Sequence, residues 1–304
     1  MIGAGYMAEE HLKAFADIPQ VQVLGIHSNS GAELLAAKFS IPHVCDSIEA
    51  LYKYTVADLV VIAVPELAVN DVCKLAFKYP WQLLIEKPVG YNIQDAENIS
   101  DAAALAGRKA YVALNRRHFS STRAVLENLS SVQGQRLVQV LDQENPNVAL
   151  EGGQPSLVVE NWMYANSIHI IDLLRVFCRG SVEVVERIVK WDPIKPSFVV
   201  AKVAFSSGDI GIYQAVWNAP GPWAVSVNTH SKRWEMRPLE MARVQAYKDR
   251  RTESIPAHEW DTKFKAGVRL QAEEAVKAVR GESHNLPSLE DGLATMKLVQ
   301  QIYA

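Results

Sequence analysis

The 304-residue chain is 49% hydrophobic and 21% charged, and since single hydrophobic cores stop growing at roughly 250–300 residues, two globular domains are expected. The formal net charge of −3 provides no overall field for binding nucleic acid or a membrane, so we expect a small molecule as the partner. No segment has the pattern of a secretory signal or a membrane span, which predicts a cytoplasmic protein. The cysteines Cys45, Cys73 and Cys178 form no CxxC pair, which predicts that the protein has no metal site.

The first third of the chain alternates short apolar runs with helical patterns, as in a parallel sheet covered by crossover helices. The run 59–64 (LVVIAV) is rich in β-branched residues, which is typical of a strand buried on both faces. Strands are predicted at 21–26, 59–64, 82–85 and 110–114, and helices at 31–39, 67–79 and 93–106. This series predicts a Rossmann dinucleotide-binding domain over residues 1–115 of an α/β chain.

Beyond residue 116 the strand patterns become longer, and turn residues separate them. Strands are predicted at 136–142, 182–191, 198–206, 209–217 and 223–229, with helices at 120–129 and 167–177. We therefore expect an α+β domain over 116–288 with a largely antiparallel open sheet, followed by a closing helix at 289–304. Because no further layer covers the open face of the sheet, a homo-oligomer, either dimer or tetramer, is expected to assemble through it.

The chain opens with a glycine-rich turn of the form G-x-G-x-x-A. In a dinucleotide site Gly3 permits the tight turn, Gly5 lets the backbone approach the pyrophosphate and Ala8 allows close helix packing, with Tyr6 and Met7 between them. An ordinary strand-to-helix turn is the alternative. The strand predicted at 21–26, at the distance of a βαβ unit, favours the dinucleotide site.

Only Met1 and Ile2 precede this turn, whereas a strand usually has about five residues. The strand feeding the turn is therefore predicted to be abbreviated or nearly absent. Either the sequence begins downstream of a natural start, or the strand is shortened at some cost in stability. A few apolar residues added before Met1 should then raise the melting temperature and the cofactor affinity.

The residues after the strand at 21–26 decide between NAD and NADP in such a domain. A carboxylate there favours a free ribose hydroxyl, and an arginine favours a 2′-phosphate. Ser28 and Asn29 occupy this place without either group, so both cofactors are compatible with the sequence.

A second motif, Ile85-Glu86-Lys87-Pro88, ends the strand predicted at 82–85. A lysine at the carboxyl edge of a parallel sheet lies in the ligand crevice, where it can exchange a proton with a substrate. The alternative is a surface Lys-Glu pair on a loop.

With the glycine turn, Val64-Pro65 and the closing helix, this motif resembles the Gfo/Idh/MocA oxidoreductases, named for glucose-fructose oxidoreductase and inositol dehydrogenase. The resemblance extends over nearly the whole chain. It implies that Lys87 hydrogen-bonds the reacting oxygen, that Glu86 contacts the nicotinamide ribose, that Pro88 follows a cis peptide bond, and that Val64 and Pro65 line the cofactor.

The stretch 165–172 resembles the family pattern Asp-x-Gly-x-His-x-x-Asp, which lies on a helix lining the substrate cleft. His169 and Asp172 match the pattern, whereas Ala165 stands where the family has a catalytic aspartate. Residues 165 and 169 lie one helical turn apart, so the missing carboxylate would have been beside the imidazole. The resemblance implies that Lys87 and His169 relay the proton. A core helix histidine is the alternative for His169.

Further residues of the second domain are candidates for contacts with the substrate. Tyr164 and Asn166 are expected to orient it. The basic cluster Arg116-Arg117-His118 predicts either an anion site, with Arg117 on a substrate phosphate or carboxylate, or a solvated charge cluster. Asp172 is expected to cap the helix or to pair with Arg175 or Arg117.

The leading hypothesis is an NAD(P)-dependent dehydrogenase or reductase acting on CH–OH groups of a sugar, polyol or nucleotide-sugar. The alternative is a catalytically weak or inactive NAD(P)-binding sensor or assembly protein, favoured by Ala165 and by the short first strand. Lys87 and His169 favour the enzyme. Because no residue identifies the substrate directly, a reductase of dihydrodiols or imines on the same scaffold is a third interpretation.

Overall fold

The computed structural model describes residues 1–304, which divide into two compact units. The first unit comprises Met1–Asn115 and Lys263–Met296, and the second comprises Arg116–Thr262 and Lys297–Ala304. The predicted boundary at residue 288 thus differs from the structure, which groups 263–288 with the first unit. The reason is α11 (Val268–Val279), whose small side chains Ala272 and Ala275 share a buried cluster with Ala14 of α1 (Tyr6–Ala16).

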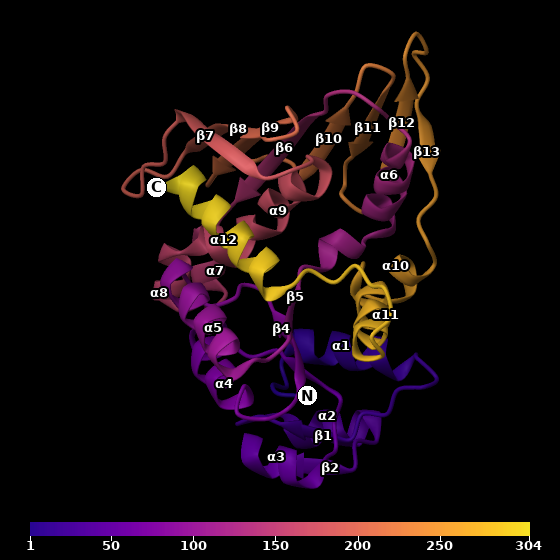
Figure 1. Cartoon of the computed structure of the whole chain (residues 1–304). Coiled ribbons are helices and arrows are strands. Elements are labelled where there is room, and N and C mark those ends of the chain that lie inside the picture. Colours follow the sequence, from indigo (N-terminus) through magenta and orange to yellow (C-terminus); the bar gives the residue numbers. More distant parts are fainter. The chain divides into compact units, whose positions relative to one another are not determined.

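The first unit contains the Rossmann-type parallel strands that the sequence predicted. β1 (Gly25–His27) pairs with β2 (His43–Cys45), and β4 (Gln82–Glu86) lies between β3 (Leu59–Ile62) and β5 (Ala110–Ala113). The other helices of this unit, visible in indigo to magenta in Figure 1, are α2 (Ala32–Phe39), α3 (Ile48–Tyr54), the 3-10 turn η1 (Glu66–Ala68), α4 (Val69–Ala76) and α5 (Ile93–Ala106).

The abbreviated first strand is a single bridging residue, Ile2, which is paired in parallel with both His27 and Ile62. Its amide donates to the Val61 carbonyl at 2.8 Å, and its carbonyl accepts from the Ala63 amide at 2.8 Å. Ile2 therefore joins the two groups of strands. The ladder ends at Met1, whose terminal amine donates to the Gly25 carbonyl at 2.9 Å, and burial lowers the pKa of this amine to about 5. The strand predicted at 21–26 is correspondingly short, because residues 21–24 have no neighbouring strand to pair with.

The second unit contains one open sheet of eight strands in the order β13-β12-β11-β10-β6-β9-β8-β7. All neighbours are antiparallel except β6 and β9, which confirms the largely antiparallel prediction. The strands are β6 (Leu137–Glu144), β7 (Val182–Val189), β8 (Phe198–Phe205), β9 (Ile210–Trp217), β10 (Ala224–Asn228), β11 (Lys232–Met236), β12 (Ala242–Ala246) and β13 (Glu253–Ile255).

Helix α9 (Ile168–Phe177) packs against β6 on one face of this sheet, as Figure 1 shows. Alternate residues of β6 are buried, namely Val138, Val140, Asp142 and Glu144. The remaining short elements are η2 (Asn115–His118), α6 (Ser120–Ser130), α7 (Pro146–Glu151), α8 (Ser156–Glu160), the π-turn η3 (Met163–Ser167) and α10 (Trp260–Lys263). The predicted closing helix is α12 (Leu289–Tyr303), and its last turn belongs to the second unit.

Two further expectations concern the cysteines and membrane spans. Cys45, Cys73 and Cys178 are buried, and none of them forms a disulfide. None of the helices combines the length and the apolar composition that crossing a membrane requires.

Candidate active site

The glycine turn has the geometry that its sequence predicted. Gly3 has a φ of +106°, and a Cβ there would collide with the carbonyl oxygen of Ala63, so this position requires glycine. Gly5 is the N-cap of α1 and has no side-chain cap, while a Cβ on it would meet no atom within 4 Å. Ala8, in the first turn of α1, is fully buried. The turn thus leaves open space at a helix N-terminus, the environment that favours a phosphate.

The other predicted cofactor residues border this turn. A Cβ on Gly3 would lie 3.3 Å from the Val64 amide nitrogen, and Pro65 follows directly as the N-cap of η1. On the other side a Cβ on Gly31 would lie 3.6 Å from the Ala4 side chain, which brings the loop carrying Ser28 and Asn29 beside the turn. Tyr6 is exposed, with the Lys265 ammonium 5.2 Å from its ring centroid, and Met7 is partly buried.

Glu86 is held against the same helix. Its Oε1 lies 2.7 Å from Nε2 of His11, a fully buried residue of α1, and its Oε2 accepts from the Lys87 amide at 3.2 Å. The Lys87–Pro88 peptide bond is cis, as expected. His11 was not predicted from the sequence, because its partner lies 75 residues away and a lone helix histidine has no local motif around it.

All these residues lie at one edge of the first unit's sheet. Ile2 is paired with His27 and Ile62, and Ile62 is paired with Ile85. The residues that follow these positions leave parallel strands at their carboxyl ends, which is where ligands bind in such sheets. Gly3, Ser28, Val64, Glu86 and Lys87 are therefore brought together by the strand register.

In the second unit the basic cluster does not form a solvated patch. Arg117 is forked onto Asp172 of α9, with Nε to Oδ2 and Nη2 to Oδ1 both at 2.7 Å. Asp172 is buried, so the predicted pairing with Arg117 is confirmed. The Arg116 guanidinium lies 4.8 Å from the ring centroid of Trp223, and His118 is buried.

The predicted substrate residues lie on η3 and the first turn of α9. His169 is buried, with its ring centroid 6.4 Å from that of Trp223, so it shares this indole with Arg116. Tyr164 is buried as well, and burial raises the pKa of its hydroxyl to about 12. Asn166 is partly exposed, and its Nδ2 donates to Glu144 at 2.8 Å.

Glu144 is a second residue that sequence reasoning missed. It lies on β6 and accepts hydrogen bonds from the three residues Trp162, Asn166 and Ser167, which surround Ala165. The register of a buried strand against a π-turn created this contact, and no motif in the sequence indicates it.

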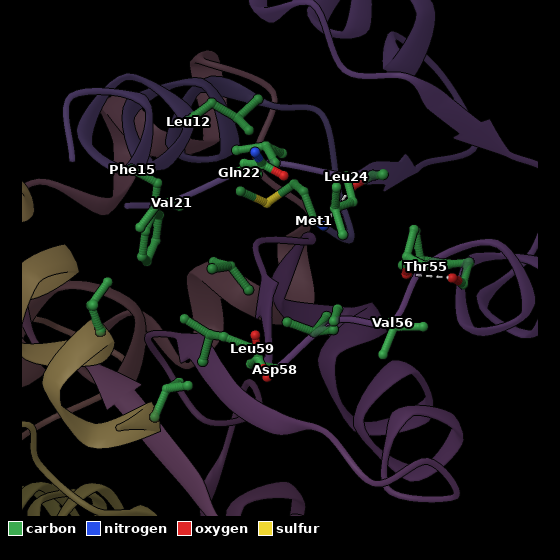
Figure 2. Close-up of a pocket in the computed structure, with 18 of the residues that line it drawn as sticks. Met1, Leu12, Phe15, Val21, Gln22, Leu24, Thr55, Val56, Asp58 and Leu59 are labelled. Carbon is green, nitrogen blue, oxygen red and sulfur yellow. Dashed lines mark hydrogen bonds between the residues drawn. The ribbon is translucent and has the colours of Figure 1, made fainter. Parts of the chain in front are cut away.

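Figure 2 shows a pocket of about 430 Å³ in the first unit, with Gln22 and Leu24 across from Asp58 and Leu59. Gln22 and Leu24 precede β1, Asp58 precedes β3 and Leu59 begins it, so the pocket lies at the amino edge of the sheet, opposite the glycine turn. Met1 lines it where the ladder ends. The pocket therefore lies next to the end of the Ile2 ladder, and it is separate from the cofactor edge.

Comparison with protein families gives one match in the first unit. Residues 1–114 match the family described as an oxidoreductase family with an NAD-binding Rossmann fold. A comparison with curated proteins finds no match.

Solved structures resemble the whole chain. A protein named as an NADPH-dependent oxidoreductase from Desulfitobacterium hafniense has a TM-score of 0.82 at 16% identity, covering 99% of this chain and 92% of that one. UDP-N-acetylglucosamine 3-dehydrogenase from Acidithiobacillus ferrooxidans has a TM-score of 0.78 at 15% identity, with 99% and 94% covered. Levoglucosan dehydrogenase in complex with NADH and levoglucosan has a TM-score of 0.77 at 16% identity, with 99% and 94% covered. At these identities the likeness establishes the fold.

Proposed function

Since residues 1–114 place this chain in the Gfo/Idh/MocA oxidoreductase family, whose Rossmann fold binds NAD, we propose that it moves a hydride between NAD(P) and a hydroxyl or keto carbon of a sugar or nucleotide sugar. The substrate class is supported by the structural neighbours, which include enzymes named for UDP-N-acetylglucosamine and levoglucosan. The bound nicotinamide would supply or accept the hydride, and the protein would position both partners and handle the proton.

The placement of Lys87 carries this proposal. Lys87 follows Glu86 at the carboxyl end of β4, on the edge of the sheet that also contains the glycine turn. The first unit offers the cofactor an open helix N-terminus at Gly5 for the pyrophosphate, the Ser28-Asn29 loop for the adenosine ribose, and Glu86 for the nicotinamide ribose. The open helix N-terminus, the hydroxyl and amide of the loop and the carboxyl group suit in polarity the phosphates and riboses of a dinucleotide.

In the proposed reaction the Lys87 ammonium hydrogen-bonds the oxygen of the reacting carbon and stabilises its developing charge. His169 of the second unit completes the proton relay, and Arg117, Tyr164 and Asn166 contribute to substrate binding. Since the Arg117 guanidinium is forked onto Asp172, its contribution is to hold η2 against α9.

The experiment combines cofactor binding with turnover. NADH and NADPH are titrated by fluorescence, and oxidised sugars and nucleotide sugars are then screened for loss of reduced-cofactor absorbance. Lys87→Ala should lower kcat/KM by about 10²–10⁴-fold with little change in cofactor Kd. Lys78→Ala is the matched control, because Lys78 is exposed beyond α4. Tight cofactor binding without turnover on any substrate, together with no effect of Lys87→Ala, would favour the sensor or assembly protein.

We also propose that the open face of the eight-stranded sheet forms the subunit interface of a homo-oligomer. Leu137 of β6 and Phe198 of β8 are exposed there, although their strand neighbours Val138 and Val199 are fully buried on the other face. Sedimentation analysis should give the mass of a dimer or tetramer, and replacing Phe198 with Glu should shift it toward the monomer.

A further inference from the structure

The second unit contains a buried pair of carboxyl groups that the proposed reaction does not use. Asp142 and Glu144 are two residues apart on β6, so their side chains share the face that α9 covers. Both are almost inaccessible to solvent, and neither forms an ion pair with a lysine, arginine or histidine. Two unpaired negative charges at this depth would be strongly unfavourable.

Hydrogen bonds around the pair come from several elements. Glu144 Oε2 accepts from Trp162 Nε1 at 2.7 Å and from Asn166 Nδ2 at 2.8 Å, and Oε1 accepts from Ser167 Oγ at 3.1 Å. Asp142 Oδ2 accepts from the Tyr213 hydroxyl of β9 at 2.6 Å, and Tyr303 of α12 lies 2.7 Å from that hydroxyl. The two carboxyl groups are also within hydrogen-bonding reach of each other.

One oxygen of this network has no donor. Asp142 Oδ1 is buried and has no hydrogen-bond donor within bonding geometry, although the Ser167 hydroxyl and the Gln143 amide approach the same carboxyl group. A proton on Glu144 Oε1 supplies this missing donor, and the pair then carries a single negative charge. Burial, and then the charge of Asp142, raise the pKa of Glu144 well above its usual range, and burial raises the pKa of Asp142 as well. The direction of both shifts agrees with a shared proton.

The other oxygen of Glu144, Oε2, fixes the orientation of a partly exposed amide. The indole N–H of Trp162 can only donate, so the Glu144 oxygen that it meets is an acceptor. Asn166 contacts the same oxygen and must therefore present its NH₂ group to it. The carbonyl oxygen of Asn166 is consequently not the atom that contacts Glu144, and this side chain is partly exposed.

We propose that Glu144 is protonated and donates to Asp142, and that this acid pair turns the Asn166 carbonyl oxygen toward a hydroxyl or N–H donor of the substrate. Glu144 is then a positioning residue, and Asn166 selects a donor group on the ligand. The inference rests on the proposed function only for the statement that η3 borders the substrate. The acid pair itself stands on the contacts within the second unit.

The first experiment tests the proton in the intact chain without any ligand. In protein with ¹³C-labelled Asp and Glu carboxyl groups, one glutamate resonance should keep the protonated position up to neutral pH and disappear in Glu144→Gln. Asp209 is the internal control, because Arg179 and two backbone amides hold its carboxylate, and its pKa is lowered to about 2 although its side chain is inaccessible to solvent. An ionised Glu144 resonance at neutral pH would overturn the proposal.

The second experiment tests the orientation of Asn166 by kinetics on whichever nucleotide sugar or sugar the wild type oxidises. Glu144→Gln keeps an acceptor toward Asn166 and a donor toward Asp142, so its KM should equal that of the wild type. Glu144→Ala and Asn166→Ala should each raise KM about 2- to 10-fold with a smaller change in kcat, which is the value of one hydrogen bond. The double variant should be no worse than either single one.

The outcomes of this second experiment are distinguishable from failure of the proposed function. Additive effects of the two alanine substitutions, or a raised KM in Glu144→Gln, would refute the positioning role. Melting curves of each variant separate a loss of folding from a change in KM. If the wild type oxidises no sugar at all, the proposed function fails, while the carboxyl resonances still decide whether the acid pair holds its proton.

Discussion

Replacing Gly5 with alanine is expected to separate cofactor binding from folding. Gly5 has φ −82° and ψ −172°, which alanine adopts readily, and a Cβ there would meet no atom within 4 Å. Losing a glycine N-cap costs up to about 1 kcal/mol, and the reduced freedom of the unfolded chain offsets this by about 0.4–1 kcal/mol. The free energy of unfolding should therefore change by less than about 1 kcal/mol.

The same methyl group would occupy the space through which a pyrophosphate approaches the backbone. Inserting a methyl into a closely packed contact costs about 1–3 kcal/mol, so the Kd for NADH should rise about 5- to 150-fold. Fluorescence titration measures the Kd, and calorimetry measures Tm on the same preparation.

Gly3→Ala provides the opposite case. Because Gly3 has a positive φ and faces the Ala63 carbonyl closely, its alanine variant should lose stability as well as cofactor affinity. If Gly5→Ala kept both its Tm and the wild-type Kd for NADH and NADPH, the dinucleotide would not bind at this turn, and the assignment of the cofactor edge would be wrong.

The Met1 amine should make stability depend on pH. Its pKa is about 5 in the folded chain against 8.0 when unfolded, so between these values the unfolded chain binds more protons and stability should rise with pH, by at most about 4 kcal/mol. Urea unfolding across this pH range measures the rise in stability. A short apolar extension before Met1 should abolish this pH dependence and should raise Tm by filling the pocket of Figure 2. A Tm unchanged by the extension would contradict the prediction. Arg117→Lys should lower the free energy of unfolding by about 1.5–3 kcal/mol, because lysine cannot reproduce the fork on Asp172, and equal stability of the two proteins in denaturant titrations would contradict it.

Local patterns in the sequence predicted most elements of the fold. The helix at 93–106 matches α5 residue for residue, and the strands at 59–64, 82–85 and 110–114 correspond to β3, β4 and β5. These segments have strong periodicity or continuous apolar runs, so burial of one face or of both faces fixes their type. The short elements β2 and α3 were missed because they are half exposed and only a few residues long.

The site was predictable where its chemistry lies in contiguous residues. The glycine turn and Glu86-Lys87-Pro88 each form a recognisable motif, since one strand end supplies all of their geometry. His11 and Glu144 were not predicted, because each becomes relevant only through a partner from another element. The lost carboxylate at Ala165 was visible in the sequence, whereas the acid pair buried next to it was not.

By itself, then, the sequence determined most of the strands and helices, the glycine turn and the lysine at the end of β4, because each depends on the order of neighbouring residues. Only the tertiary structure decided that α11 joins the first unit, that Ile2 alone connects the parallel strands, and that Glu144 holds Asn166. The physical reason is that burial acts across the chain: the charge state and hydrogen bonds of a side chain are set by whichever distant groups pack against it.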